Sequence, residues 1–130
     1  MKFRSGLAAF AVIFSGNLAY AQPPHRFTGI AAFYSPDYAG RTASGERYDP
    51  GKFTAAHRSL PFGTRLRVTD PRSRRSVVVV VNDRGPFTKG RVLDLSLAAA
   101  KVLRMTGRGL MRITAISESD VNFTTEPTKP

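Results

Sequence analysis

The sequence contains no cysteine, only two histidines, and fewer than half as many acidic as basic side chains, 9 against 20. Without cysteine the fold has no disulfide, no thiolate metal site and no cysteine for lipid attachment. His25 and His57 lie far apart in the sequence, which disfavours a histidine-rich metal site. The core alone therefore has to stabilise the fold.

Several functional motifs are also missing. We find no phosphate-binding loop, no nucleophilic serine motif and no metal-ligand spacing. No internal repeat is present, and no second domain is indicated. These absences point away from nucleotide-dependent, serine-nucleophile and metal-dependent chemistry.

The first residues have the pattern of a secretion signal. Lys2 and Arg4 form a short basic start, residues 6–14 are mostly apolar, and Ala19-Tyr20-Ala21 matches a signal-peptidase site. The apolar stretch is shorter than the roughly 20 residues that span a bilayer, which disfavours the alternative of an uncleaved anchor. We expect a signal peptide over residues 1–21, a flexible leader over 22–26, one domain over 27–118 and a disordered tail over 119–130.

The mature chain expected from this cleavage carries 18 basic and 9 acidic side chains, a formal charge of +9. Such a balance is typical of proteins that meet nucleic acid or another anionic surface. Export disfavours nucleic acid and favours the anionic polymers of a cell envelope. The alternative is a solvated basic surface that only aids solubility.

The most distinctive segment of the sequence is a run of five valines at residues 77–81. The run is β-branched throughout and too short for an ordinary helix, so it predicts a strand covered on both faces. The sequence NDRGP follows at 82–86, and its glycine and proline predict a loop that begins beside Asp83. Asp94 places a charged side chain inside a second apolar run, at 91–95. A charge in such surroundings requires either a pairing partner or a functional role.

Other segments complete a map of the strands. Composition or alternation predicts strands at residues 27–34, 64–69 and 110–116, with a hairpin turn at 70–75. The polar sequence from residue 117 onward predicts disorder. Five or six short strands with one small helix predict a small closed β-barrel, because closure removes exposed strand edges.

Loops and helix signals lie between these strands. Residues 38–49 predict a long loop that carries glycines and polar side chains. Asp49-Pro50 predicts a short helical turn. Ser96 is the expected N-cap of a helix that ends at Gly107. The residues expected on its packed face are Ala99, Val102 and Leu103.

Three acidic residues, Glu46, Asp83 and Asp94, stand beside loop glycines or inside apolar sequence. Acid-catalysed cleavage of a glycosidic bond needs a carboxyl group that holds a proton in a partly apolar setting, and often a second group that accepts one. Asp83 fits the first requirement. The alternatives remain a turn residue or ion-pair partner for Asp83, a buried acid capping the Ser96 helix for Asp94, and a solvated loop acid for Glu46.

Two further kinds of side chain can join such a site. His57 can orient a carboxylate or titrate near neutrality, although a lone histidine is more often structural. Aromatic residues that flank the same loops can offer flat faces and hydroxyl groups to sugar rings, or can simply pack. These aromatic residues are Tyr34, Tyr38, Tyr48 and Phe87.

Six segments taken together go beyond any single motif. In chain order they are GIAAFY at 29–34, GRTASGERY at 40–48, TAAHRSLP at 54–61, GTRLRVT at 63–69, VVNDRGPF at 80–87 and GRVLDLSLAAA at 90–100. In this combination the sequence resembles the rare lipoprotein A family over nearly the whole expected domain. The resemblance implies an all-β fold, a six-stranded double-psi β-barrel with one or two short helices, as in expansins and barwin-like proteins. It also implies an exported, endolytic lytic transglycosylase that needs no cofactor and acts on peptide-poor peptidoglycan strands.

The same resemblance implies roles for individual residues. The functional acids and histidine of the family fall at Glu46, His57 and Asp83, and Asp94 matches a key aspartate of expansins. Asp83 would protonate the glycosidic oxygen between MurNAc and GlcNAc. The resulting carboxylate, or Glu46, would then take the proton of the muramic C6 hydroxyl as a 1,6-anhydro ring closes, while His57 hydrogen-bonds a carboxylate. The residues expected to bind substrate are Tyr34, Tyr48, Arg84 and Phe87.

Typical members of that family carry a lipid-attachment cysteine, and many carry a C-terminal domain that binds denuded glycan. The 130 residues show neither. We therefore expect a monomeric protein, in the periplasm or outside the cell, that is not a lipoprotein, does not bind nucleic acid and has no stable membrane insertion. The alternative from another class is an expansin-like module that grips or loosens peptidoglycan without cutting it.

Overall fold

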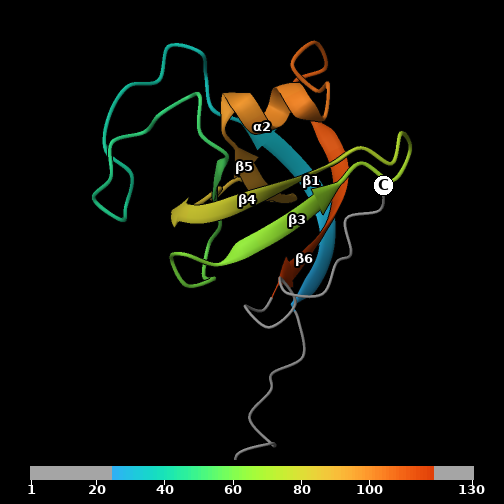
Figure 1. The fold of residues 1–130 in the computed structure, drawn as a ribbon, viewed down its shortest axis with the longest axis horizontal. Helices are drawn as coiled ribbons and strands as arrows, with labels where there is room; N and C mark the ends of the chain where they lie inside the picture. Colours follow the sequence, from blue (N-terminus) through green and yellow to red (C-terminus); the bar gives the residue numbers. More distant parts are fainter. Residues whose placement is uncertain (1–24, 119–130) are drawn as a thin grey trace, which may run out of the picture.

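The computed structural model describes residues 25–118. In this part of the chain the apolar segments form strands and the polar segments form turns and loops. The elements are β1 (Arg26–Phe33), β2 (Thr54–Ala56), β3 (Arg65–Thr69), β4 (Ser76–Asp83), β5 (Arg91–Leu95), α2 (Leu97–Val102) and β6 (Met111–Glu118). The strands close into a barrel in the order β1-β5-β2-β4-β3-β6 (Figure 1). The expected six-stranded barrel with a short helix is confirmed. Residues 25–118 contain no helix with the length and hydrophobicity of a transmembrane span.

Parallel and antiparallel pairs alternate in part around the barrel. β1 pairs with β5 and β2 pairs with β4 in parallel, and the other neighbours are antiparallel. The three-residue strand β2 has no hydrophobic pattern of its own, and the sequence did not indicate it. It is a strand because β4 and β5 supply hydrogen-bonding partners on its two sides.

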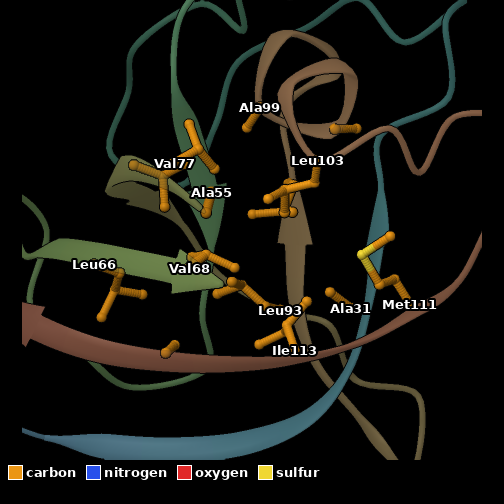
Figure 2. Close-up of a cluster of buried hydrophobic side chains, with 14 of the residues drawn as sticks. Ala31, Ala55, Leu66, Val68, Val77, Leu93, Ala99, Leu103, Met111 and Ile113 are labelled. Atoms are coloured by element: carbon orange, nitrogen blue, oxygen red, sulfur yellow. The ribbon is translucent and has the colours of Figure 1, made fainter. Parts of the chain in front are cut away.

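The valine run lies along β4 with its side chains alternating between inside and outside. Val77, Val79 and Val81 are buried, whereas Val78 and Val80 are only half-buried. The expectation of a strand covered on both faces is therefore wrong, because a closed barrel has one packed interior and a partly solvated outside. Other members of the interior cluster are Ala31, Ala55, Leu66, Val68, Leu93, Ala99, Leu103, Met111 and Ile113 (Figure 2).

Helix α2 begins where the sequence indicated but ends earlier. Ser96 is the N-cap, and its side chain accepts an amide hydrogen bond from the first turn. The helix ends at Val102, and Arg104 then adopts a left-handed conformation with φ of 56°, so the expected stop at Gly107 is wrong. Val102 is 40% exposed, although it was expected on the packed face. The buried residues of this segment are Ala99, Ala100 and Leu103.

The short turn expected at Asp49-Pro50 is present, and in it the amide of Lys52 donates to the carbonyl of Asp49. Two other segments differ from expectation. β6 continues through Glu118, so disorder does not begin at residue 117. Arg26, placed in the expected leader, already pairs with β6. The expected signal peptide, the start of the leader and the tail from residue 119 lie outside the described residues.

Candidate active site

Asp83 ends β4 at the point where the valine strand reaches the surface, as the sequence predicted. Its Oδ1 accepts hydrogen bonds from the backbone amides of Ala43 at 2.8 Å and Arg84 at 2.9 Å. Its Oδ2 accepts a 2.5 Å hydrogen bond from the hydroxyl of Tyr34. No ion pair to Asp83 is found within residues 25–118. Oδ1 therefore accepts two backbone amides, and Oδ2 accepts one side-chain hydroxyl.

Three tyrosines form one cluster beside this carboxylate. The ring of Tyr34 stacks on that of Tyr48, with centroids 4.4 Å apart and planes 15° apart, and Tyr38 meets both rings edge-on. Burial, followed by the hydrogen bond to Asp83, raises the pKa of Tyr34 well above its ordinary value. The Tyr34 hydroxyl therefore stays protonated and remains a donor to Asp83.

Tyr48 is the buried member of this cluster. It is 6% exposed, and its hydroxyl accepts the amide hydrogen bond of Leu97 at the start of α2. Burial raises the pKa of Tyr48 as well. The expectation that Tyr48 offers a face to substrate does not agree with this burial, because Tyr34 covers its ring. Tyr48 instead joins α2 to the tyrosine cluster.

The loop over residues 38–49 is docked onto the end of β4. The amide of Ala43 binds Asp83, and the amide of Ser44 donates to the carbonyl of Asn82 at 3.2 Å. The hydroxyl of Ser44 donates to Oε1 of Glu46 at 3.2 Å. Glu46 is exposed, and these contacts hold the loop that carries it against the end of β4. Sequence spacing had left the two acids 37 residues apart.

Asp94 lies two strands away from Asp83 in the same row of the sheet. The register pairs Ala56 of β2 with Asp83 on one side and with Asp94 on the other. Adjacent strands are about 4.8 Å apart, so the two aspartate Cα atoms are separated by about 10 Å across one small side chain. Asp94 forms an ion pair with Arg91 and does not cap α2, which corrects the structural alternative for this residue.

The structure places His57 beside the aspartates through its backbone, not through its ring. Its amide donates to the carbonyl of Asp83 at 3.1 Å. Its Nδ1 accepts the amides of Ser59 and Leu60, both at 3.1 Å, so the neutral ring carries its proton on Nε2. Within the described residues the ring contacts no carboxylate, and the expected hydrogen bond to one is not formed.

Burial is also what sets the charge of the His57 ring. Burial, with additional effects from Arg84 and Arg58, lowers its pKa. The ring packs against Phe27, with centroids 5.2 Å apart, in a groove of about 220 Å³. Val92 lines the same groove. A neutral imidazole therefore presents an Nε2–H donor at the barrel surface.

Two arginines hold the loops around the site. The guanidinium of Arg84 donates to the carbonyl of Leu60 at 2.8 Å and lies 4.0 Å over the ring of Phe62. Arg58 was not singled out from the sequence, yet its guanidinium binds the backbone of the loop after β4. The carbonyl oxygens that it contacts belong to Pro86, Thr88 and Arg91. Its place next to His57, in the TAAHRSLP segment at 54–61, is the signal that could have indicated it.

Phe87 is the exposed aromatic residue of this region. It is 80% exposed and lies in the loop that Arg58 binds. A flat apolar ring with this exposure is available to a sugar face. Among the residues expected to bind substrate, Phe87 is thus highly exposed to solvent. Arg84 is hydrogen-bonded to the loop at 57–62, and the ring of Tyr48 is buried under that of Tyr34.

Solved structures with the same architecture identify the fold of this chain. The chain is similar to the Streptomyces papain inhibitor, with a TM-score of 0.60, 24% identity, and coverage of 73% of this chain and 96% of that one. It is equally similar to the expansin of Clavibacter michiganensis, with a TM-score of 0.60, 24% identity, and coverage of 82% and 54%. The fold is a double-psi β-barrel. A family model described as "Lytic transglycolase" matches residues 26–115, and the chain belongs to this family.

Curated relatives agree with the resemblance found in the sequence. A Nostoc protein named "Probable endolytic peptidoglycan transglycosylase RlpA" is 64% identical over 87 residues, which are 65% of this chain and 24% of that protein. "Endolytic peptidoglycan transglycosylase RlpA" of Pasteurella multocida is 49% identical over 83 residues, 63% of this chain and 28% of that protein. The chain therefore spans only about a quarter of the length of these relatives.

Proposed function

We propose that this chain is an extracytoplasmic lytic transglycosylase that cleaves the β-1,4 bond between MurNAc and GlcNAc in peptidoglycan. Membership of the lytic transglycolase family supports the reaction, and the names of the RlpA relatives support the substrate. The observation that carries the proposal is Asp83, held by three hydrogen bonds at the end of β4.

Asp83 is the acid in this proposal. Oδ1 is filled by two amides, so the transferable proton is carried on Oδ2. In the first step Oδ2 gives this proton to the glycosidic oxygen, and the bond from that oxygen to C1 of the muramic residue breaks. Tyr34 fixes the position of Oδ2 while its own proton stays on the hydroxyl.

Ring closure completes the reaction without water. The C6 hydroxyl oxygen of the muramic residue bonds to C1, and its proton passes to a carboxylate. Asp83, now ionised, or Glu46 accepts this proton, and the loop that carries Glu46 binds Asp83 through the amide of Ala43. The product is a 1,6-anhydro-muramic end. If Asp83 accepts the proton, it is ready for the next cycle; if Glu46 accepts it, the proton passes to Asp83 through solvent before the next cycle.

Other residues of the site bind and orient the glycan. Because Nδ1 of His57 already accepts two amides, Nε2–H is its free donor. The ring contacts no carboxylate within the described residues, so Nε2–H donates to a sugar oxygen. Phe87 offers its exposed ring to a sugar face. Arg84 and Tyr48 act indirectly, because the first holds the loop at 57–62 and the second supports the ring of Tyr34.

The test is mass spectrometry of the soluble products released by the purified protein from intact and from amidase-stripped peptidoglycan. Anhydro-muramic ends, released faster from stripped strands, are expected. Reducing ends would replace the proposal with hydrolysis by the same acids. Absence of product with retained co-sedimentation would identify a non-catalytic binding module of the expansin kind.

A further inference from the structure

A second concave surface lies at the opposite end of β4 from Asp83, between the β3–β4 hairpin and the segment that leads from α2 into β6 (Figure 1). Its volume is about 230 Å³. It is lined by Asp70, Pro71, Arg72, Arg108, Leu110, Met111 and Arg112. We call this surface the arginine groove. None of its residues belongs to the proposed active site.

Positive charge is concentrated around this groove. Residues 70–75 and 101–112 together carry seven basic side chains and one acidic one, a net formal charge of +6. The rest of residues 25–118 carries a net charge of only +4 over about four times as many residues. The acidic residue, Asp70, is buried, and its oxygens accept hydrogen bonds from the amide of Arg72 at 3.0 Å and the hydroxyl of Ser73 at 2.8 Å. The groove therefore presents mainly positive charge to the solvent.

The arginines of the groove are not held by carboxylates. The ion pairs found within residues 25–118 join Arg67 to Glu118 and Arg91 to Asp94, at other places on the barrel. The three arginines that line the groove are all exposed. A guanidinium group pairs with phosphate oxygens through two parallel hydrogen bonds. These side chains are therefore available to an anionic partner, and phosphate suits their geometry.

An exposed leucine lies among these arginines. Leu110 lines the groove and is 54% exposed, although its neighbour Met111 is buried in the core. Val102, at the end of α2 in the same basic segment, is 40% exposed. A soluble anion gains little from contact with an aliphatic side chain. At a bilayer, however, basic side chains meet the headgroups while apolar ones enter the boundary with the acyl chains.

We propose that the arginine groove is a docking surface for a membrane that contains anionic phospholipids. Its arginines bind the phosphates of the lipid headgroups, and Leu110 enters the boundary between headgroups and acyl chains. The contact is peripheral and uses side chains at one end of the barrel. Each basic side chain close to an anionic leaflet raises affinity roughly fivefold, so the seven around the groove can hold the protein reversibly at the surface.

Docking through this groove sets the direction in which the active site faces, and this consequence rests on the proposed function. β4 runs from Ser76, beside the hairpin, to Asp83, about 23 Å at 3.3 Å per residue. A protein held by the arginine groove therefore carries Asp83 on the side away from the lipid. The cleft then faces polymer that lies outside the membrane.

The test measures co-sedimentation of the purified protein with vesicles of phosphatidylcholine alone and of phosphatidylcholine with about 30% phosphatidylglycerol, at low and high salt. The groove variant combines Arg108→Gln with Arg112→Gln. The matched control combines Arg26→Gln with Lys52→Gln, two exposed positions elsewhere. Every variant is made in the same chain, so any contribution from the apolar residues 6–14 is common to all. Thermal unfolding verifies that each variant folds.

A second pair of variants tests the apolar contact and distinguishes lipid from other sources of phosphate. Leu110→Gln removes the exposed leucine, and its control, Phe53→Gln, removes an apolar side chain that is 48% exposed at another place on the barrel. Both are measured on the anionic vesicles and on soluble poly(glycerol phosphate), which offers phosphates without a bilayer.

We expect binding to the anionic vesicles, weakened by salt, and little binding to the neutral ones. The groove variant should bind the anionic vesicles about tenfold to thirtyfold more weakly. Its control should change affinity by less than about threefold, because charges away from the contact are screened. Leu110→Gln should weaken vesicle binding by about threefold to tenfold and leave the affinity for poly(glycerol phosphate) unchanged. Phe53→Gln should alter neither.

Several outcomes would overturn the proposal. They are equal losses in the groove variant and its control, equal binding to neutral and anionic vesicles, and vesicle binding that Leu110→Gln leaves intact. Tighter binding of poly(glycerol phosphate) than of anionic vesicles would also overturn it, in favour of a soluble anionic polymer. Because these assays involve no turnover, absence of anhydro-muramic product is a separate failure, that of the proposed function.

Discussion

The hydroxyl of Tyr34 lies 2.5 Å from Oδ2 of Asp83, and this contact joins the end of β1 to the end of β4. The two residues are 49 positions apart in the sequence. Stacking on Tyr48 fixes the ring of Tyr34, and burial raises the pKa of its hydroxyl. A rigid donor thus sets the position of the oxygen that we propose as the proton carrier.

Tyr34→Phe should keep the stacked ring and remove only this hydrogen bond. We expect kcat to fall about tenfold to a hundredfold with little change in KM, because a misplaced catalytic group slows the chemical step. The free energy of unfolding should decrease by about 1 to 2 kcal/mol. Steady-state kinetics and urea unfolding measure the two effects.

Tyr38→Phe is the matched control, because the hydroxyl of Tyr38 is exposed and makes only a 3.4 Å contact with the carbonyl of Arg41. It should leave kcat within about twofold. A Tyr34→Phe variant that raises KM while leaving kcat intact would instead place Tyr34 in substrate binding, as the sequence had indicated.

Removing the charge of Asp83 should reduce turnover more than removing that of Glu46. Asp83→Asn should reduce turnover about 10³-fold and Glu46→Gln about 10²-fold, in the range that general acid and base groups contribute. Asn at position 83 can still accept the two amides through its oxygen, so folding should persist. Product formation by mass spectrometry and thermal unfolding report on the two properties.

Asp94→Asn tests whether Glu46 or Asp94 is the second acid beside Asp83. If Glu46 is the second acid, Asp94→Asn should cost less than about tenfold, because Asp94 is occupied by Arg91. A loss larger than that of Glu46→Gln would assign the second role to the aspartate across Ala56. Retained turnover in both Asp83→Asn and Glu46→Gln would contradict the whole assignment.

The lowered pKa of His57 predicts how stability depends on pH. In the unfolded chain the ring titrates near its ordinary value of 6.5, whereas the folded protein resists protonation. The unfolded state therefore binds more protons below about pH 6.5, and stability should fall as the pH drops from 6.5 toward the lower pKa of the folded state. His57→Asn should flatten the change in melting temperature between pH 7.5 and 5.5. Parallel curves for the two proteins would show that His57 does not carry this effect.

Gly29 in β1 is required by the side chain of Val92 in β5. A Cβ at position 29 would lie 2.6 Å from Cγ1 and 2.9 Å from Cγ2 of Val92, and a β-branched side chain cannot rotate away freely. Gly29→Ala should lower the free energy of unfolding by about 1 to 3 kcal/mol. Adding Val92→Ala should restore part of this loss, and denaturant unfolding of the four proteins in the cycle tests it. Additive losses would mean that the two side chains do not clash.

Prediction from the sequence was most accurate where a segment carries its own pattern. β3 and β6 alternate between apolar and polar residues, β4 is a continuous run of valines, and the positions of all three were predicted within two residues at each end. β2 was missed because its three residues are strand only through β4 and β5. The outer valines of β4 were misjudged because a run of β-branched residues does not reveal whether a second layer covers it.

The candidate site shows the same division. The loop position of Asp83 and the presence of Glu46 and His57 were predicted, in part from the resemblance to a known family. Which atom each side chain uses could not be predicted, because the amides that occupy Nδ1 of His57 and Oδ1 of Asp83 come from folded loops. The exposure of Phe87 and the burial of Tyr48 are likewise properties of packing.

By itself, the sequence determined the all-β class, the absence of disulfides, the excess of positive charge and the residues that carry the family resemblance. Local polarity and composition are sufficient for these properties, since they depend on neighbours in the chain. Only the tertiary structure decided that Tyr34 donates to Asp83, that Ala56 separates two aspartates, and that distant arginines share one groove. Those relationships join residues tens of positions apart, and the order in which the strands close the barrel brings them together.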